Sequence, residues 1–524
     1  MGWSELVVQL LYWAGTLACN GVAVKDLSDA GSRAASLALL QFALLLGGSR
    51  LHLVADMLGV SLGMLVRIHK TAGWMAALQS GIHIAIVSAC LGVLILTSLK
   101  PVRQYVYELF IKLHYGLAVC NLVFLWLHVR QVSSTSPFWK PSFTVGCLEV
   151  TSILMAATTL WQIGRILCYN FAPGKTLPIA RIHQWEQGNK SPDVIKVCVL
   201  LPRGWNVRAG QTVYLYLKTM KFWTFPEAHP FSITWWQDPG HMPGIPRPLK
   251  DKAPQSTNSS EIGKASKEAR YRPLDDRAAE DIRQFGRYEK TTGKETDAAF
   301  TEHDDLGSFA IWLLVRPDRG LTGDIASYRS LTELGVIVDG PYGGQQRLDR
   351  YGHVVMFAQG IGIAAQMSYI RALFYGSLNG ELPTRRICLL WETREKDLII
   401  VQKWMTKLLT EDHDNYNRTL MLDIQLYILD QKDGLRYGRR VKTFAGPVDI
   451  KDVMRGELER RRGRMLVTVS ASEKFADELQ RHMLELMDEG FKNDDVELLY
   501  LDFQPQQPHK VPPSEGKGAV IVSV

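Results

Sequence analysis

Four of the five histidines in the first 130 residues form two pairs with equal spacing: His69 with His83, and His114 with His128. The members of each pair are fourteen residues apart, nearly four helical turns, so they face the same way about 21 Å apart along the axis. Ionisable side chains are costly in a bilayer and tend to be functional there. Two such helices can hold two haems stacked across a membrane, with a histidine on each side of each iron. The other interpretation, interfacial or bundle-capping histidines, is disfavoured by the repeated spacing.

The pairing across the irons depends on how the chain crosses the membrane. If the basic residues beside His69 and His114 face the cytosol, these two histidines form the inner pair, and His83 with His128 the outer pair. A single long helix across 71–99 would instead make the two histidine helices antiparallel and pair His83 with His114. Both arrangements give two haems with two histidines each, and the spacing alone does not choose between them.

Composition divides the chain into an apolar part and a polar part. The 524 residues carry a net charge of +7, with a mean hydropathy of −0.04. Residues 1–170 are largely apolar, whereas 171–524 have the composition of a soluble protein. The modest charge gives no indication of a nucleic-acid partner. The seven cysteines contain no CxxC pair, so neither a zinc site nor a disulfide framework is indicated.

Apolar segments in the first part suggest several membrane crossings, since about 20 residues are needed to span a bilayer. The candidate spans lie at about 5–24, 35–48, 71–99, 111–130 and 144–168. The first segment lacks a basic n-region and a clear cleavage site, so we expect a retained helix rather than a signal peptide. The sequence therefore predicts a polytopic α-helical domain in contact with membrane lipid.

The soluble part opens with short runs that are typical of strands. VIKVCVL (194–200) and QTVYLYL (211–217) are β-branched or alternating runs broken by Gly and Pro. The run HPFSIT (229–234) is consistent with a strand entered through a proline, and FAIWLLVR (309–316) with a further strand. Between these two runs the chain at 238–307 is polar and charged, with few large apolar residues, which predicts a disordered insert.

Two glycine-rich turns follow. VIVDGPYG (336–343) is a strand and a turn, and VVMFAQGIGIAA (354–365) is a strand, a glycine turn and a helix start, with Ala365 as the third position of GxGxxG. A strand that feeds glycines into a helix N-terminus suits a pyrophosphate. Beyond the next strand, Arg394 and Lys396 suit a 2′-phosphate, which favours NADPH over NADH. The other interpretation of these two cations is a solvated loop.

HPFSIT, GPYG and GIGIAA, in this order after two paired-histidine segments, resemble the fungal-type ferric reductases, relatives of the NADPH oxidases. The stretches 29–34 (DAGSRA) and 51–74 also resemble the approach to that family's first haem helix. The resemblance implies an NADPH-dependent ferric-chelate reductase for iron uptake. In such an enzyme NADPH gives a hydride to FAD in the cytosol, and single electrons then pass through an inner and an outer haem to an acceptor across the membrane.

The resemblance implies a fold in three parts. A polytopic α-helical haem bundle (1–170) precedes a ferredoxin-reductase-like module. That module combines an antiparallel β-barrel FAD domain (177–345) with an α/β Rossmann-like NADPH domain (350–505), and a polar tail (506–524) ends the chain. The resemblance also implies an integral membrane protein, in the plasma membrane, with the FAD/NADPH module in the cytosol.

The resemblance further implies which residues bind each cofactor. The FAD residues come from HPFSIT and a strand-end turn, the NADPH residues from the two glycine turns and the arginine, and the ligands of two b-type haems from the histidine pairs. They are His229, Pro230, Phe231, Ser232, Ile233, Thr234, Arg319, Gly320 and Thr322 for FAD; Gly340, Pro341, Tyr342, Gly343, Gly360, Gly362, Ala364 and Arg394 for NADPH; His69 with His114 for the inner haem and His83 with His128 for the outer haem.

Three departures from the family matter. Only thirty residues separate His83 from His114, where the family has a longer connection and a further helix, which affects the expected haem geometry but not the ligand set. The Cys-Gly that the family often places near the nicotinamide is VSAS (469–472) here, which changes the surroundings of hydride transfer. The usual aromatic ending is replaced by Phe503 and a polar tail, and Phe503 is our candidate for the aromatic beside the flavin.

Two alternative functions remain compatible with these residues. A superoxide-producing NADPH oxidase uses the same cofactors, because the external acceptor, ferric chelate or dioxygen, leaves no readable motif. A degenerate, non-catalytic membrane haem protein would explain the altered Cys-Gly site and the short helix connection. The intact HPFSIT and GPYG runs favour an active reductase over that last alternative.

Overall fold

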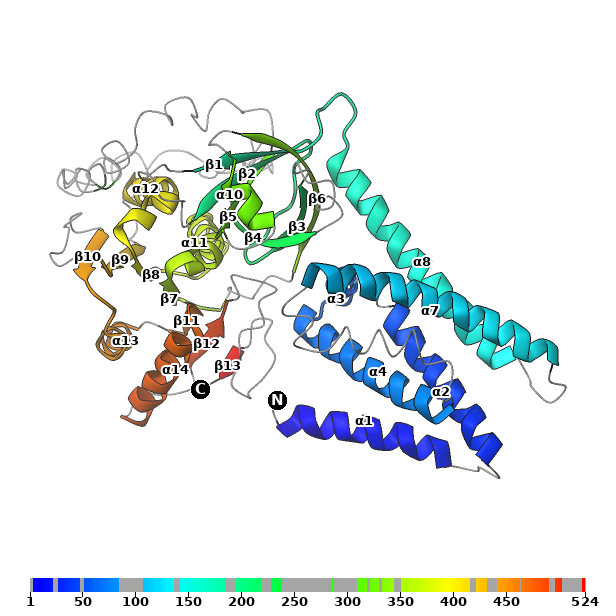
Figure 1. Cartoon of the computed structure of the whole chain (residues 1–524). Helices are drawn as coiled ribbons and strands as arrows, with labels where there is room; N and C mark the ends of the chain where they lie inside the picture. Colours follow the sequence, from blue (N-terminus) through cyan, green and yellow to red (C-terminus); the bar gives the residue numbers. More distant parts are fainter. Residues whose placement is uncertain are drawn as a thin grey trace, which may run out of the picture.

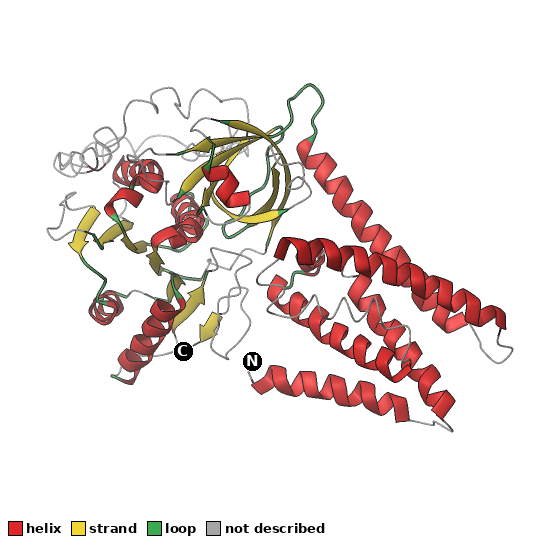
Figure 2. Ribbon diagram, viewed as in Figure 1, coloured by secondary structure: helices red, strands yellow, loops and turns green. Residues whose placement is uncertain are grey.

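The computed structural model shows a set of long helices, a β-barrel and an α/β domain in chain order (Figure 1). Figure 2 shows that the strands are confined to the last two parts. The structure describes residues 3–21, 27–47, 51–83, 107–135, 142–184, 194–217, 228–237, 309–317, 321–328, 332–343, 350–414, 421–430, 441–461, 463–489, 495–501 and 521–523, together with Ile282 and Phe285.

The helical part packs through a small apolar cluster and a few polar contacts. Its helices are α1 (Trp3–Gly21), α2 (Leu27–Gly47), α3 (Leu51–Leu58), α4 (Leu62–His83), α7 (Tyr107–Thr135) and α8 (Ser142–Asn170). Leu39, Leu122 and Leu148 bury a common cluster between α2, α7 and α8. Trp126 Nε1 donates to Ser152 Oγ at 3.0 Å and thereby links α7 to α8.

Two of the described helices contain a segment long and apolar enough to cross a membrane. These segments are Leu113–Arg130 and Val145–Asn170, which fall within the predicted spans 111–130 and 144–168 or overlap them. The predicted span at 71–99 coincides with a helix that already begins at Leu62 and is described as far as His83. The remainder of that span, and the connection as far as residue 106, lies outside the described residues.

The second part is a closed barrel of six antiparallel strands, as the sequence predicts for the flavin module. They are β1 (Ile179–His183), β2 (Ile195–Leu201), β3 (Thr212–Leu217), β4 (His229–Gln237), β5 (Phe309–Val315) and β6 (Glu333–Tyr342), joined in the order β1-β2-β5-β4-β3-β6. Strand β2 shows the alternation that builds the interior: Ile195, Val197 and Val199 point inward, whereas Cys198 packs outside the barrel. Leu321 and Ile325 of α10 (Leu321–Ala326) complete the interior cluster.

The third part is a seven-stranded sheet with helices on both faces. Its strands are β7 (His353–Gln359), β8 (Arg386–Thr393), β9 (Leu422–Ile428), β10 (Val441–Ala445), β11 (Met465–Ser470), β12 (Val496–Tyr500) and β13 (Ile521–Ser523), in the order β10-β9-β8-β7-β11-β12-β13. The helices are α11 (Ile363–Leu378), α12 (Ile399–Asp414), α13 (Ile450–Glu459) and α14 (Glu473–Asp488). All neighbours are parallel except β12 and β13. The chain passes from β7 to β8 and later returns to the other side of β7 as β11, which makes β7/β11 the switch point where ligands bind such sheets.

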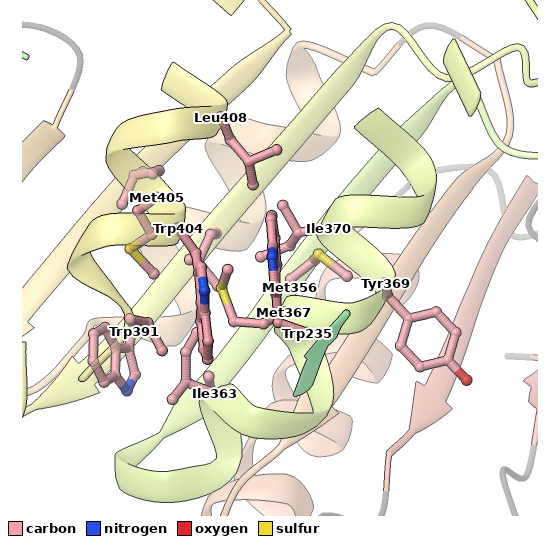
Figure 3. Packing of buried hydrophobic residues seen from close by; sticks show 14 of the residues in the cluster. Trp235, Met356, Ile363, Met367, Tyr369, Ile370, Trp391, Trp404, Met405 and Leu408 are labelled. Atoms are coloured by element: carbon pink, nitrogen blue, oxygen red, sulfur yellow. The ribbon is translucent and has the colours of Figure 1, made fainter. Parts of the chain in front are cut away.

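The barrel and the α/β domain share one apolar core (Figure 3). Trp235 of β4 stacks on Trp404 of α12, with ring centroids 5.5 Å apart and planes 9° from parallel. Trp312 of β5 meets the same indole edge-on at 6.4 Å, and Lys196 of β2 places its ammonium 4.0 Å from the ring centre. The outer face of the barrel is therefore buried against α12.

The segment between β4 and β5 contributes to this shared core. Ile282 and Phe285 are buried in it, and Gln402 of α12 donates through Nε2 to the Phe285 carbonyl oxygen. The prediction of a disordered insert over 238–307 is wrong for these two residues, because both side chains are buried against the shared core. The other residues of the predicted insert lie outside the described residues.

A network of ion pairs fixes the amino-terminal edge of the sheet. His353 Nε2 lies 2.9 Å from Glu457 Oε2, and Arg386 bridges Glu457 at 2.8 Å and Asp423 at 2.7 Å. Cys388, Asp423 and Glu457 lie close enough together to hold a metal ion. The guanidinium of Arg386 already neutralises both carboxylates, so we interpret this cluster as a structural ion network.

The first prediction concerns the acid sensitivity of this network. Burial by itself raises the pKa of Glu457, but hydrogen bonds from His353 and Arg386 outweigh it and lower the pKa to about 2, from 4.5. The stabilisation is therefore fully present above pH 4.5 and lost as the pH falls from about 4.5 to 2, and it amounts to roughly 3 kcal/mol.

Glu457→Gln should remove this stabilisation and lower the free energy of unfolding at pH 7, measured by urea unfolding of the full chain with tryptophan fluorescence. The gap between wild type and variant should close as the pH falls below about 2. Glu485→Gln, on the exposed side of α14, is the control and should unfold like the wild type. A Glu457→Gln protein that matches the wild type at pH 7 would show that the network adds no stability.

Candidate functional site

Strand β4 divides the residues of HPFSIT between two faces. Phe231 and Ile233 belong to the apolar cluster inside the barrel. Pro230 and Ser232 alternate with them and lie on the outer face. Thr234 sits where the register of β4 against β5 shifts, and it is fully buried. The Oγ1 atom of Thr234 is buried and has no hydrogen-bond partner among the described residues. Buried hydroxyl groups are normally paired, and the predicted contact of Thr234 with the flavin stays a prediction.

The other residues predicted to bind the flavin are only partly described. His229 begins β4 and is half-buried. Thr322 is half-buried in the first turn of α10. Arg319 and Gly320, just before that helix, lie outside the described residues, as does Phe503. The flavin roles of all five stay predictions.

The glycine turn after β7 is built around one very close approach. A Cβ atom at Gly362 would lie 1.9 Å from the carbonyl oxygen of Ser470, at the end of β11, so no side chain fits there. Gly360 adopts a positive φ of +53°, which favours glycine. Ser470 Oγ donates to the Gly362 carbonyl oxygen at 2.8 Å, and Ala364 is buried in the first turn of α11. The glycines thus bring β7, β11 and the start of α11 together at the switch point.

Gln359 connects the carboxyl ends of three strands at this turn. Its Nε2 donates to Glu392 Oε2 at 2.9 Å, and its Oε1 accepts from the Ser472 backbone N–H at 3.2 Å. Glu392, at the end of β8, accepts a further bond from the Val448 N–H at 2.9 Å. The buried carboxylate is therefore paired within the α/β domain and forms one wall of the adjoining pocket.

A pocket of about 190 Å³ lies beside the glycine turn. Gly360 and Arg394 both line it. Their predicted contacts with the two ends of one nucleotide stay predictions. Arg394 is 43% exposed, with its Nε 3.6 Å from Asp397 Oδ2, so an acidic neighbour orients the guanidinium while leaving it accessible. Arg316, at the end of β5, lines the same pocket from the barrel side.

The 340–343 turn (GPYG) lies elsewhere, against the helical part. The Tyr342 ring is buried with its centroid 4.6 Å from that of His52 on α3 and 4.7 Å from the guanidinium carbon of Arg165 on α8. The Gly343 carbonyl accepts from Gln211 Nε2 at 3.3 Å. Among the described residues that line the pocket, none belongs to this turn. Its predicted contact with NADPH stays a prediction.

Asp339, just before this turn, is ionised, whereas Tyr342 within the turn keeps its proton. Burial raises the pKa of Asp339, but hydrogen bonds from His52, Tyr342 and Gln162 outweigh it and bring the pKa below its ordinary value. Burial and the neighbouring Asp339 raise the pKa of Tyr342. At neutral pH the Tyr342 hydroxyl therefore keeps its proton and donates a hydrogen bond to the Asp339 carboxylate.

The helix histidines meet in one of the two arrangements left open by the sequence. The ring centroids of His69 on α4 and His114 on α7 are 6.4 Å apart, with planes 62° from parallel. Both helices begin at the end of the bundle nearest the barrel and run away from it (Figure 1). His128 is half-buried further along α7, and the side chain of His83 lies outside the described residues. The pairing of those two stays a prediction.

Sequence reasoning missed the residues that connect the parts. His52, Gln162 and Asp339 form a buried polar cluster between α3, α8 and β6. The sequence did carry a signal for two of them: Gln162 is an uncharged polar residue in an apolar helix, and Asp339 immediately precedes GPYG. Their contacts span more than a hundred positions, which local patterns do not report.

A family model described as an FAD-binding domain matches residues 181–346. The chain contains an FAD-binding domain. The matched range runs from β1 to just beyond β6, so this domain is the closed barrel. Ferric reductase transmembrane component 4 of Saccharomyces cerevisiae is 27% identical over 151 residues, which are 28% of this chain and 18% of that protein. The chain thus matches less than a fifth of this relative's length, and the resemblance to the ferric reductases is confirmed.

Solved structures are also similar to this chain at low sequence identity. A flavohemoglobin from Malassezia yamatoensis with bound FAD and heme is 12% identical, with 89% of this chain and 95% of that chain covered and a TM-score of 0.35. A ferredoxin NADP+ reductase from Neisseria gonorrhoeae with bound FAD and NADP is 11% identical, with 62% and 97% covered and a TM-score of 0.33. At these scores the fold assignment rests on the strand order of the chain itself.

The close approach at Gly362 generates the second prediction. Gly362→Ala places a methyl group against the Ser470 carbonyl oxygen, and overpacking of this kind costs about 1–3 kcal/mol. We expect the Tm to fall by roughly 2–4 °C for each kcal/mol in a domain of this size, and NADPH to bind more weakly.

Gly456→Ala is the matched control. Gly456 lies inside α13 with open space around its Cα, so alanine should be neutral or stabilise by about 0.5–1 kcal/mol. Differential scanning calorimetry and NADPH titration measure both variants. Equal Tm values for the two variants would mean that the turn can move away from Ser470 without cost.

Proposed function

We propose that this chain is a membrane-bound, NADPH-dependent ferric-chelate reductase that passes electrons from a nicotinamide coenzyme, through FAD and two b-type haems, to ferric chelates across the membrane. The observation that carries the proposal is the facing pair His69 and His114 in the same chain as an FAD-binding domain. The resemblance to a ferric reductase transmembrane component supports the acceptor class. The two apolar helical segments support the membrane location.

The spacing of His69 and His114 fits an iron between them. A metal–imidazole bond is about 2 Å long and each ring adds about an ångström, so two axial imidazoles stand roughly 6 Å apart from centre to centre. The observed distance is 6.4 Å. The Nδ1 atom of His69 is buried without a hydrogen-bond partner among the described residues, so hydrogen bonding through this nitrogen does not explain the position of the ring. These two side chains would hold the iron of the inner haem.

The barrel and the α/β domain supply positions for the other two cofactors. Ser232, on the outer face of β4, would hold the flavin, together with Thr234, which brings an unpaired buried hydroxyl. Gly360 and Arg394 would hold the phosphates of NADPH in the pocket that they share. When bound, FAD converts two-electron hydride chemistry into single electrons, and haem carries single electrons. The protein positions these groups and excludes water.

The third prediction tests the function directly. In purified membranes, NADPH should drive the reduction of Fe(III)-EDTA faster than the reduction of dioxygen. His114→Ala should lose about one haem per chain in a pyridine haemochrome assay, because one axial ligand is removed. It should also lose ferric reduction, while keeping FAD and NADPH-driven reduction of a soluble dye.

His482→Ala, on the partly exposed α14 of the α/β domain, controls for the loss of any histidine and should keep both haems. Two haems in the His114→Ala protein would contradict the ligand assignment. If the wild type forms superoxide faster than it reduces ferric chelate, the protein is an NADPH oxidase and the proposed reductase function is wrong.

The fourth prediction concerns coenzyme choice. A guanidinium can grip a 2′-phosphate through charge-assisted hydrogen bonds worth roughly 1.5–3 kcal/mol each. Arg394→Ala should therefore raise the KM for NADPH about tenfold or more and leave the KM for NADH nearly unchanged. Lys396 offers a second cation two residues later, so Arg394→Ala combined with Lys396→Ala is the stricter test.

Arg385→Ala provides the control, since this exposed arginine precedes β8 at the opposite edge of the sheet. Its KM values should match those of the wild type for both coenzymes. An NADPH preference that survives the double substitution, or a wild type that prefers NADH, rules out the role of Arg394.

A further inference from the structure

A buried polar cluster connects the helical part of the chain to the flavin barrel. Gln162 of α8 donates through Nε2 to Asp339 Oδ2 at 2.6 Å, and the same nitrogen lies 3.2 Å from His52 Nε2 on α3. His52 Nε2 lies 3.5 Å from Asp339 Oδ2, and the Tyr342 hydroxyl donates to Asp339 Oδ1. We call His52, Gln162, Asp339 and Tyr342 the α3–β6 joint.

Ring contacts and an ion pair surround the joint. The His52 ring lies 4.7 Å from Tyr214 of β3 and 4.6 Å from Tyr342 of β6, measured between centroids. Arg165 of α8 stands over the Tyr342 ring at 4.7 Å and pairs with Asp56 of α3 at 3.6 Å. Two helices and two barrel strands therefore meet at one point.

The end of α8 adds a second link to β6. Asn170 Nδ2 donates to the Val338 carbonyl oxygen at 2.7 Å, and the Val338 N–H donates back to Asn170 Oδ1 at 2.7 Å. This two-way pattern is the one that a neighbouring strand makes with a residue of a sheet. The last residue of α8 thus acts as an extra partner for the strand that carries Asp339.

The charge of Asp339 makes the joint specific for one orientation. The residue is 1% exposed, and a buried carboxylate is costly unless it is paired and hydrogen-bonded. Its donors come from α3, α8 and β6. A rotation of the barrel against the helices would strain the contacts from α3 and α8. Both oxygens of Asp339 are paired, and hydrogen bonds are strong in a low-dielectric interior, although Gln162 Oε1 is buried without a partner among the described residues.

The joint lies between the elements that the proposed function assigns to electron transfer. Helix α3 is followed after three residues by α4, which carries His69. Strand β6 pairs with β3, and β3 pairs with β4, which carries Ser232 and Thr234. Any change in the joint therefore changes the position of the flavin strand relative to the histidine helices.

We propose that the α3–β6 joint is a positioning element, which fixes the flavin barrel against the helical part in the orientation that electron transfer to the inner haem requires. This inference rests on the proposed function. When bound, the reduced flavin would supply single electrons to the inner haem, and the residues of the joint would hold the flavin strand and the histidine helices in place for that transfer.

Asp339→Asn tests the proposal in the full chain with its cofactors, because the amide keeps the size of the side chain and removes its charge. In stopped-flow measurements with NADPH, flavin reduction should keep its wild-type rate, and haem reduction should slow about tenfold or more. FAD content and haem content should equal those of the wild type. Equal haem reduction rates in wild type and variant overturn the proposal.

Hydrogen exchange gives a readout that does not depend on electron transfer. Peptides covering α3 and Val338 should exchange roughly tenfold faster in Asp339→Asn, because the joint opens locally, whereas peptides from β5 should not change. Unchanged exchange in α3 also overturns the proposal. If the wild type shows no haem reduction at all, the proposed function fails, and the exchange result still decides whether the joint holds the barrel.

Two further variants separate polar pairing from packing. His52→Phe keeps the ring between Tyr214 and Tyr342 but removes the contact with Asp339, so it should behave like Asp339→Asn. Gln162→Leu should do the same from α8, which covers the case in which one variant fails to fold. Glu333→Gln is the control: it removes a carboxylate at the exposed start of β6, 2.7 Å from Arg181, and should match the wild type in both measurements.

Discussion

Closure of the barrel by β6 is the constraint on which the rest of this structure depends. The strand pairs with β1 at its beginning and with β3 along its second half, so the sheet has no free edge and every outward-facing residue has a fixed direction. On one side, this places β4 and β5 against α12 of the α/β domain. On another, it presents Asp339 and Tyr342 to α3 and α8. The barrel is thus the part that locates the other two.

The two interfaces of the barrel use different physics. Toward the α/β domain the contact is aromatic and apolar, with Trp235, Trp312 and Trp404 in a common core. Such a contact is stabilised by buried area and tolerates small shifts of one surface over the other. Toward the helices the contact is polar and charged, and its hydrogen bonds depend on distance and angle. The orientation of the barrel is therefore fixed more tightly relative to the helices that carry the histidines than relative to the α/β domain.

Alternating patterns in the sequence predicted the strands of the barrel well. VIKVCVL became β2 with Ile195 and Val197 inside, and HPFSIT became the first part of β4. The glycine turn also appeared where the sequence predicts it, at a strand end that leads into α11. These features follow from residues that are neighbours in the chain, and composition and spacing report such neighbours directly.

Contacts between distant residues could not be predicted in the same way. Gly362 is required by the carbonyl oxygen of Ser470, more than a hundred residues later, whereas the motif alone suggested a phosphate. The 340–343 turn faces α3 because barrel closure turns the end of β6 toward the helices, and no local pattern encodes that direction. The docking of Ile282 and Phe285 depends on a surface of α12 that exists only in the folded protein.

That docking has a consequence for how the soluble parts can be separated. Strands β4 and β5 are neighbours in the barrel, yet the chain that connects them touches α12 of the next domain on its way. A fragment cut after residue 345 would leave Trp235, Trp312 and Leu314 without their cover and would expose a contiguous apolar patch of the kind that drives association. The barrel and the α/β domain are distinct in topology, but their shared core makes them one unit of folding: each needs the other to cover its apolar surface.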